Sequence, residues 1–290
     1  MKVELFDFKV LKDFPSGSGI EYFDEKIFLV GDDAKEILVL SKKWKKLDSI
    51  PLFKSPDARI PKKSKADLEA TTIVEINSIP RLLVLGSGSK DTRNKLVLVN
   101  LDDYSKEEID ITVFYNRLSG QLPVVNIESA AVVLGKLVLG NRGNKSAPDN
   151  HIIVTDIDFW KHQDTVEIKL VELDLPKAIK QQVGLSGMTY SYKNDWLMAT
   201  LSTENTSNAV DDGPVGDSYL VVVENASRKI SRKKMNINEL INLSEAEKAF
   251  RGYKIESVCI QSEKSGRAKI HLVADNDTGV SYLFKVRIKG

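Results

Sequence analysis

The amino-acid sequence predicts an all-β protein, a five-bladed β-propeller that spans residues 1–290 as a single domain. Two observations lead to this fold class. First, one pattern occurs five times: a polar residue, a short apolar run, a turn and further apolar runs. Second, each copy holds four short runs rich in Val, Ile, Leu and aromatic residues, as expected for four antiparallel strands. Repeats of this length with four strands each are typical of a propeller.

The five copies follow one another along the chain with uneven spacing. Each copy is keyed on one polar residue at the start of its first apolar run. The keyed residues are Glu21, Glu69, Glu128, Ser186 and Glu256. The extra residues fall in polar segments such as residues 203–217, so we expect similar blades joined by loops of different length.

The first three copies divide in the same way, with a two-strand hairpin followed by two single strands. Glycine, asparagine and aspartate separate the apolar runs, as turns between strands require. These segments are residues 19–33, 36–41 and 45–52 in the first copy, 67–89, 95–101 and 107–114 in the second, and 124–144, 151–157 and 166–173 in the third.

The fourth copy has its hairpin in residues 184–205 and its single strands in residues 218–224 and 232–237. The fifth copy has residues 254–277 and 281–288 but lacks a fourth strand. Near the N-terminus, an apolar run has no copy of its own, and we expect residues 1–12 to complete the fifth blade. Such closure removes a sheet edge that would otherwise be exposed.

The composition narrows the classes of function. A hydrophobic content of 42% supports a sizeable core, and 42 Lys and Arg residues nearly balance 41 Asp and Glu residues. This balance gives no reason to expect binding to nucleic acid or to a membrane. We see neither a signal peptide nor a membrane-spanning run, and the single cysteine, Cys259, excludes an internal disulfide. We therefore expect a cytoplasmic protein with a buried, inert thiol.

The keyed residues predict a metal site. In a propeller the first strand of each blade lines the central channel, so four carboxylates and one hydroxyl should converge at one mouth. Their mutual repulsion is most simply relieved by a cation, and oxygen ligands favour Ca²⁺, with Mg²⁺ as second choice. No histidine occupies a keyed position, which argues against zinc or iron. Alternatively, the carboxylates hydrogen-bond to backbone amides of neighbouring blades and hold the ring together.

The ends of the second strands should reach the same mouth, because these strands run back toward the start of the first. The polar residues at these ends are Asp32, Asp33, Ser87, Ser89, Asn141, Arg142, Glu204, Asn205, Asp275, Asn276 and Asp277.

At this point the residues resemble a family. The succession of Glu69, Glu128, Ser186 and Glu256, with IESAA followed by GNRGN around Arg142, resembles the calcium-activated nucleotidase (apyrase) propellers. The repeat is also similar to phytase-like and SdiA-regulated propellers and to an uncharacterised bacterial propeller family. The nucleotidase resemblance implies five blades and calcium ligation at these four residues. Glu21 departs from it, because that family has a serine in blade one.

The resemblance leads to a functional hypothesis: a metal-dependent phosphohydrolase, nucleotidase- or phytase-like, acting on a small phosphorylated or anionic molecule. Arg142 matches a phosphate-facing arginine of the nucleotidases, and Arg93 could reach the same mouth. These side chains would neutralise charge on phosphoryl oxygens, and Glu204 or Asp32 would position the attacking water as general base. The alternative is a non-catalytic propeller that binds a ligand or a protein, with a structural cation or none.

Overall fold

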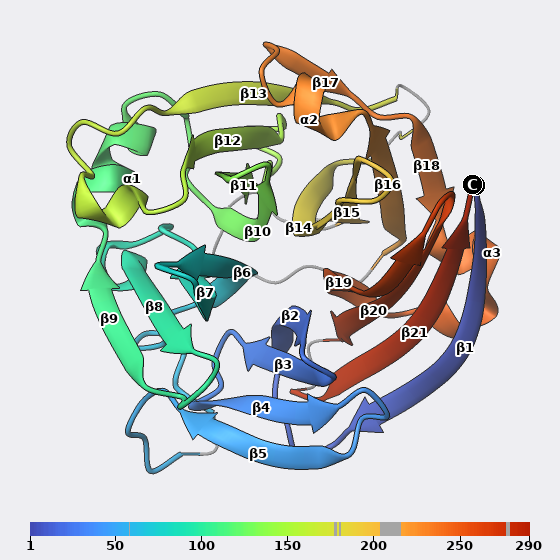
Figure 1. Cartoon of the computed structure of the whole chain (residues 1–290), viewed down its shortest axis with the longest axis horizontal. Coiled ribbons are helices and arrows are strands. Elements are labelled where there is room, and N and C mark those ends of the chain that lie inside the picture. The colour runs from blue at the N-terminus through green and yellow to red at the C-terminus, as the bar shows by residue number, and fades with distance from the viewer. Residues whose placement is uncertain (58, 177–178, 180, 204–215, 277–278) are drawn as a thin grey trace.

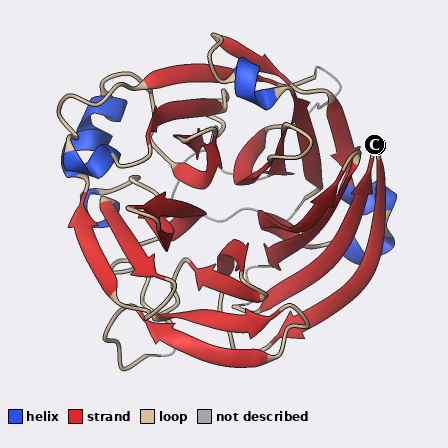
Figure 2. Cartoon of the chain, viewed as in Figure 1, coloured by secondary structure: helices blue, strands red, loops and turns tan. Residues whose placement is uncertain are grey.

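Five sheets stand around a central axis and form a closed ring (Figure 1). The computed structural model describes the whole chain except residue 58, residues 177–178, residue 180, residues 204–215 and residues 277–278. Strands make up almost all of the regular structure, and short helices lie only at the periphery (Figure 2). The predicted five-bladed β-propeller is confirmed.

Blades one and two each contain four antiparallel strands in sequence order. Their inner hairpins turn through Asp24–Glu25 and Asn77–Ser78, and both residues of each pair have positive φ, the geometry of tight two-residue hairpin turns. Blade one consists of β2 (Gly17–Phe23), β3 (Lys26–Gly31), β4 (Glu36–Ser41) and β5 (Lys46–Pro51). Blade two consists of β6 (Leu68–Ile76), β7 (Ile79–Gly86), β8 (Lys95–Asn100) and β9 (Lys106–Asp110).

Blades three and four share a departure from the predicted strand order. Blade three consists of β10 (Ile127–Val133), β11 (Lys136–Asn141), β12 (His151–Asp156), β13 (Lys169–Asp174) and β17 (Lys234–Asn236). Blade four consists of β14 (Val183–Ser191), β15 (Trp196–Thr203), β16 (Ser218–Glu224) and β18 (Glu239–Asn242).

The prediction that residues 232–237 form the outer strand of blade four was wrong. After β16 the short helix α2 (Ala226–Lys229) leads the chain toward blade three, where β17 pairs in parallel with β13. Met235 of β17 is fully buried in the hydrophobic cluster between blades three and four. The chain then returns, and β18 takes the outer position of blade four instead.

Blade five joins the two ends of the chain, as predicted. It consists of β19 (Lys254–Lys264), β20 (Arg267–Asp275), β21 (Ser281–Lys289) and the N-terminal strand β1 (Lys2–Leu11). In the register of β1 with β21, Lys2 lies opposite Lys289 and Leu11 opposite Ser281. Figure 1 shows β1 as the outermost strand of this blade.

Helices fill gaps at the rim. They are α1 (Thr112–Ser119), α2, α3 (Leu243–Ala246) and the 3₁₀-helices Asp91–Arg93, Phe159–Lys161 and Lys248–Phe250. The predicted strand at 107–114 ends at Asp110, whose Oδ1 accepts the Thr112 N–H at 2.8 Å, and α1 then begins. Among the described residues, no helix is long and apolar enough to cross a membrane.

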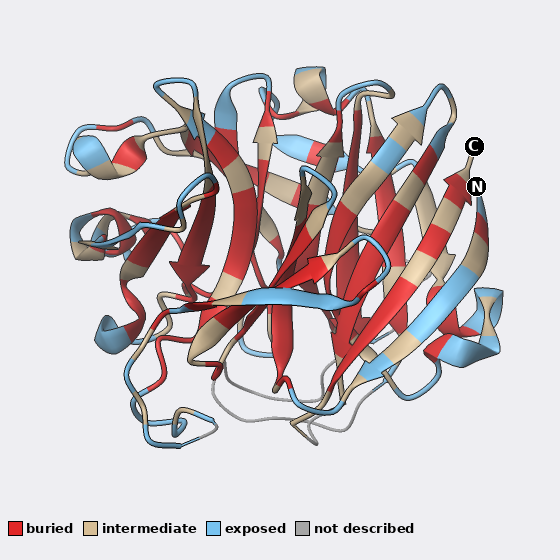
Figure 3. Cartoon of the chain, turned by 60° about the horizontal axis from the view of Figure 1, so that its bottom comes forward, coloured by how far each residue is buried: buried red, intermediate tan, exposed pale blue. Residues whose placement is uncertain are grey.

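The core is divided among the blade interfaces. Five hydrophobic clusters each lie between two neighbouring blades, and Figure 3 shows buried residues along the strands with exposed residues mainly in loops and outer strands. Cys259 belongs to the cluster between blades five and one, and burial raises the pKa of its thiol well above the usual range. The expected burial of this thiol is confirmed.

Candidate functional site at the channel mouth

One irregularity recurs at the same place in all five inner strands. In each first hairpin the pairing register shifts by one residue, so that a single residue bulges from the ladder. A bulge re-aims the side chain that it carries. Because the five inner strands stand side by side around the axis, these side chains come to one level. The bulged residues are Ser18, Glu69, Glu128, Ser186 and Glu256.

The register corrects the predicted residue for blade one. Ser18, not Glu21, occupies the position equivalent to the keyed residues of the other blades. Glu21 lies opposite Phe28, three residues further along β2, which corresponds to about 10 Å deeper along the strand. Burial raises the pKa of Glu21 well above its usual range. The structure therefore places Glu21 below the ring of bulged residues.

An acidic cluster lies where blades one and two meet. Asp32, Asp67 and Glu69 each place a carboxylate oxygen within 4.8 Å of the others. Lys65 forms ion pairs with Asp32 and with Asp67, the latter at 2.8 Å. Asp67 also accepts a hydrogen bond from Ser87 Oγ at 2.6 Å. One ammonium group is thus shared among several carboxylates.

Charged groups of both neighbouring blades affect the pKa of Glu69. Burial raises its pKa well above the usual range, and the carboxylates of Glu128, Asp67 and Asp32 raise it further, against the opposing effect of Lys65. Because Glu128 belongs to the next blade, this repulsion acts between blades as well as within the cluster. An added cation would relieve this repulsion.

Glu128 lies beside a buried arginine. Arg142 is 4% exposed, and its guanidinium is 3.8 Å from Glu128 Oε2 and donates to Ser202 Oγ at 3.0 Å. Gly184 makes room for it, because a Cβ there would lie 2.5 Å from Arg142 Nε. Asn126 holds the other Glu128 oxygen through a 2.7 Å hydrogen bond. Arg142 is thus buried beside a residue of the ring, and its binding of an anion stays a prediction.

Arg93 also reaches this region, although it too is buried. Its guanidinium forms an ion pair with Asp67 at 2.5 Å and donates to Ser89 Oγ at 2.6 Å. Tyr115 donates to the carbonyl of Gly86 at 2.6 Å, which ties helix α1 to the end of β7 below this arginine. Arg93 is 2% exposed, so its charge is largely neutralised within the protein.

Glu256 and its neighbour Lys254 form a second lysine–carboxylate pair. Lys254 Nζ is 2.9 Å from Glu256 Oε1. The other oxygen, Oε2, is buried and has no hydrogen-bond partner within the described part of the chain. The same is true of Oδ1 of Asp32. Buried carboxylate oxygens without a partner are unusual and call for an unseen water or ion.

The two serines of the ring contact the next blade in the same way. Ser18 Oγ donates to the carbonyl of Leu68 at 2.6 Å, and Ser186 Oγ donates to the carbonyl of Ile255 at 2.7 Å. Each acceptor directly precedes a bulged glutamate. The serines therefore link blades, and they fix the backbone that positions Glu69 and Glu256.

Sequence reasoning missed three polar residues of this mouth. Asp67, Asn126 and Lys254 each lie two residues before a bulged glutamate and bind side chains of the site. An alignment of the copies on the bulge would have revealed this polar position. Lys65 comes from the connection between blades one and two, which follows no repeat. Glu204, expected as a general base, lies outside the described residues.

A polar hollow opens beside the acidic cluster. Its volume is about 340 Å³, within the range of small-molecule sites. Arg59 crosses it, with Nε 2.6 Å from Asp33 Oδ2. The hollow is lined by Ser16, Asp32, Asp33, Arg59, Ile60, Pro61, Lys62, Lys65 and Asp275.

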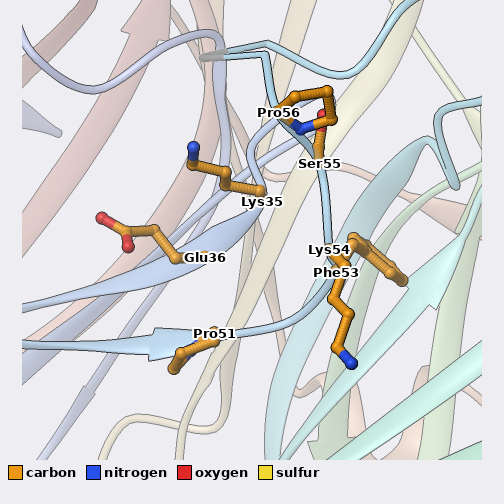
Figure 4. Close-up of a pocket in the computed structure, with 7 residues that line it drawn as sticks. All are labelled: Lys35, Glu36, Pro51, Phe53, Lys54, Ser55 and Pro56. Carbon is orange, nitrogen blue, oxygen red and sulfur yellow. The ribbon is translucent and has the colours of Figure 1, made fainter.

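A larger hollow lies on the outer side of blade one. Figure 4 shows that its side chains do not converge on a common point, and its acidic residue, Glu36, points away from the two prolines. Its volume is about 470 Å³, and it is lined by Lys35, Glu36, Pro51, Phe53, Lys54, Ser55 and Pro56. It offers no cluster of carboxylates comparable to the channel mouth.

The residues at the mouth fit a hard divalent cation. Carboxylates outnumber the cationic groups among the described mouth residues, and all available donors are oxygen atoms. Partnerless oxygens on Asp32 and Glu256 face no competing donor there. Ca²⁺ accepts six to eight oxygens at about 2.3–2.6 Å, whereas Mg²⁺ requires tighter octahedral geometry. A site built from carboxylates of several blades suits the less strict coordination geometry of Ca²⁺ better.

The closed ring of five blades, four of them four-stranded and one extended by β17, defines the protein as a five-bladed β-propeller. The chain belongs to the family of unknown function DUF6929, whose profile matches residues 13–288. No curated protein matches the sequence.

Solved structures resemble the chain in fold. Glutaminyl cyclase from Myxococcus xanthus has 10% identity and a TM-score of 0.57, with 99% of this chain and 96% of that chain covered. A candidate glycoside hydrolase from Parabacteroides distasonis has 9% identity and a TM-score of 0.50, with 94% and 87% covered. At such low identity these likenesses establish the fold alone.

Proposed function

We propose that the channel mouth binds Ca²⁺ and that the protein hydrolyses a phosphate ester or anhydride there. The observation that carries this proposal is the repeated bulge, which gives Glu69, Glu128 and Glu256 the same position in their blades as Ser18 and Ser186. Repeating one irregularity in five blades serves no purpose in strand pairing, because each bulge leaves a residue unpaired. Holding the three bulged glutamates at one level of the channel mouth, with the two serines fixing the backbone before Glu69 and Glu256, explains it.

The register in blade one adds support. The nucleotidase resemblance implies a serine in the first blade, and Ser18 stands at that bulge. The extra carboxylate assigned to the ring, Glu21, lies deeper along β2. With Ser18 in its place the ring carries one carboxylate fewer, and a less anionic ring repels a phosphate-bearing substrate less strongly.

Three residues would act on a phosphate group in this proposal. A bound Ca²⁺ would supply polarisation of a phosphoryl oxygen. Arg142, and Arg93 from the neighbouring blade, would neutralise charge on the remaining oxygens. Burial raises the pKa of Asp32 to about 6, with Asp33 and Asp67 adding to burial and Lys65 opposing it. The raised pKa makes Asp32 a stronger base than an exposed aspartate, as activation of a water molecule requires.

One observation favours a second candidate, a binding propeller in which the cation is structural. Arg93 and Arg142 are almost completely buried, and both already contact carboxylates and hydroxyls of the protein. Such pairing would leave little positive charge for a substrate. The two candidates share the Ca²⁺ site and differ in whether anything reacts there.

The cation is tested by thermal unfolding of EDTA-treated protein, titrated separately with Ca²⁺ and Mg²⁺. An ion at 100 times its dissociation constant adds about 2.7 kcal/mol. For a chain of this length that corresponds to a rise of about 5 °C in the unfolding midpoint. Glu128→Gln should abolish the rise, and Glu107→Gln, an exposed acid on the outer strand β9, should preserve it. No rise with either cation would refute the Ca²⁺ site.

The reaction is tested separately by phosphate release from nucleoside diphosphates, nucleoside triphosphates and phosphate monoesters, with Ca²⁺ and with EDTA. Hydrolysis predicts Ca²⁺-dependent release that Asp32→Asn and Arg142→Lys each reduce at least about 100-fold. Ca²⁺ stabilisation without release from any substrate would refute the hydrolase and leave the binding propeller.

A further inference from the structure

The outer strand of blade five differs from the other outer strands. β5 ends at a proline and carries Lys46 and Asp48, while β9 is charged at four of its five positions. β18 has four residues, and β13 is covered by β17. Charge, proline, shortness and cover are the usual means of keeping a sheet edge from pairing with another chain. Four of the five outer edges are therefore protected.

β1 is long and apolar by comparison. It has ten residues, and its far edge has no strand partner within the described chain. Phe6, Phe8 and Val10 are 44%, 38% and 38% exposed. Figure 3 shows the mostly exposed strand at the side of the molecule that bears the N-terminus. An edge of this kind is a template for pairing with a further strand.

A bulge divides β1 into two halves. The register with β21 shifts between Leu5 and Asp7, so Phe6 is the extra residue. As a result, Val3 and Leu5 share one face with Phe8 and Val10, toward the cluster between blades four and five.

The opposite face of β1 carries its charges. Glu4 pairs there with Lys289 at 3.1 Å, and Lys9 donates to the carbonyl of Trp44 at 2.5 Å. Lys2 and Asp7 belong to the same side by the register. One face of the strand is thus apolar, whereas the other carries the charges together with Leu11 and with Phe6, whose ring centroid is 4.3 Å from the guanidinium carbon of Arg287.

We propose that two copies of this chain dimerise by antiparallel pairing of their β1 strands about a two-fold axis between Phe6 and Asp7. Directly opposed residues of antiparallel strands must point to the same face. In this register Val3 faces Val10 of the second copy and Leu5 faces Phe8, so apolar residues meet on one face. On the other face Glu4 lies opposite Lys9.

The charge pattern selects this register. The bulge changes which residues share a face, so registers that place the axis on a residue would oppose apolar and charged faces. Moving the axis by one residue toward the N-terminus would place Lys2 opposite Lys9 and Glu4 opposite Asp7. Like charges directly opposed across strands are unfavourable, whereas opposite charges stabilise the pair. Charge complementarity of the strand with itself identifies the partner as a second copy.

The test measures the dimer dissociation constant of the full chain by sedimentation velocity at protein concentrations from about 1 to 100 µM. The wild-type protein should dimerise within this range. By symmetry each charge reversal alters two pairs, so Lys9→Glu and Glu4→Lys should each raise the constant at least about tenfold. The double variant Glu4→Lys/Lys9→Glu restores opposite charges and should return the constant to near the wild-type value.

Two measurements distinguish a loss of dimerisation at the interface from a defect in the fold of the monomer. The thermal midpoint of each variant shows whether the monomer is intact, which matters because Glu4 also pairs with Arg287 and Lys289. Lys46→Glu, on the outer strand of blade one, should leave the constant unchanged. A protein that stays monomeric at about 100 µM would overturn the proposal. So would a dimer that single and double reversals affect alike.

Discussion

Lowering the pH should destabilise the fold through one buried histidine. His271 on β20 is fully buried, and its Nδ1 accepts a hydrogen bond from Trp44 Nε1 at 3.2 Å, so this nitrogen carries no proton. Burial, together with the ammonium groups of Lys285 and Lys269, lowers the pKa of His271 from 6.5 to about 3. The native state therefore keeps the imidazole neutral over a range in which the unfolded chain protonates it.

The sign and size of the effect follow from linkage. Above pH 6.5 both states are neutral at His271, and its contribution to stability is fully present. As the pH falls below 6.5, His271 binds a proton in the unfolded state, whereas in the native state it stays neutral until about pH 3. Each pH unit in this window costs up to about 1.4 kcal/mol, so the loss between pH 7 and pH 4 is about 3 kcal/mol.

The assay is urea unfolding followed by circular dichroism at pH 7, 5.5 and 4, with the free energy obtained by linear extrapolation. Other groups also titrate, so the informative quantity is the difference between wild type and His271→Gln. The variant should lose about 3 kcal/mol less stability over this range. Trp44→Phe is the matched control, because it removes the indole donor but retains the buried imidazole and its pH dependence. Equal losses in wild type and His271→Gln would refute the reasoning.

Three further predictions concern stability at pH 7, each measured by urea unfolding. Gly184→Ala should destabilise the protein by about 1–3 kcal/mol, because the new Cβ would displace the buried guanidinium of Arg142, and a neutral result would contradict this packing. Ser186→Ala should cost about 1–3 kcal/mol, because the carbonyl of Ile255 loses a hydrogen bond from the neighbouring blade. Leu134→Asn should stabilise by about 1 kcal/mol, because this exposed residue has φ 47° in a tight hairpin turn that favours asparagine.

The number of blades and the closing strand could be predicted because strand periodicity and turn residues recur in every copy. The equivalent residue of blade one could not. A bulge adds one residue without changing the apolar pattern around it, and the order of residues at Glu21 imitates that at Glu256. Only the hydrogen-bond register distinguishes Ser18 from Glu21.

Contacts between residues of different blades could not be predicted from the sequence repeat either. Lys65 lies in a connection whose length and course are set by tertiary packing, yet it pairs with acids from two blades. Likewise, the residues after β16 have the composition of a strand, and a strand is present there. Burial of Met235 beside blade three, however, determines that β17 pairs with β13. The local sequence pattern predicts that a segment forms a strand. Which strand it pairs with depends on the apolar surface that is available to bury its side chains.

The pairing of β1 with β21 has a consequence for biosynthesis. On the ribosome, β1 emerges well before its partner β21, because all residues between Leu11 and Ser281 are made in the interval. At typical rates of translation, the first strand waits for tens of seconds with its phenylalanines unpaired. During this interval the nascent chain exposes an apolar, aggregation-prone strand, which a chaperone that binds unfolded chains could cover. We therefore expect ring closure to be a late step of folding, which cannot begin before β21 has been made.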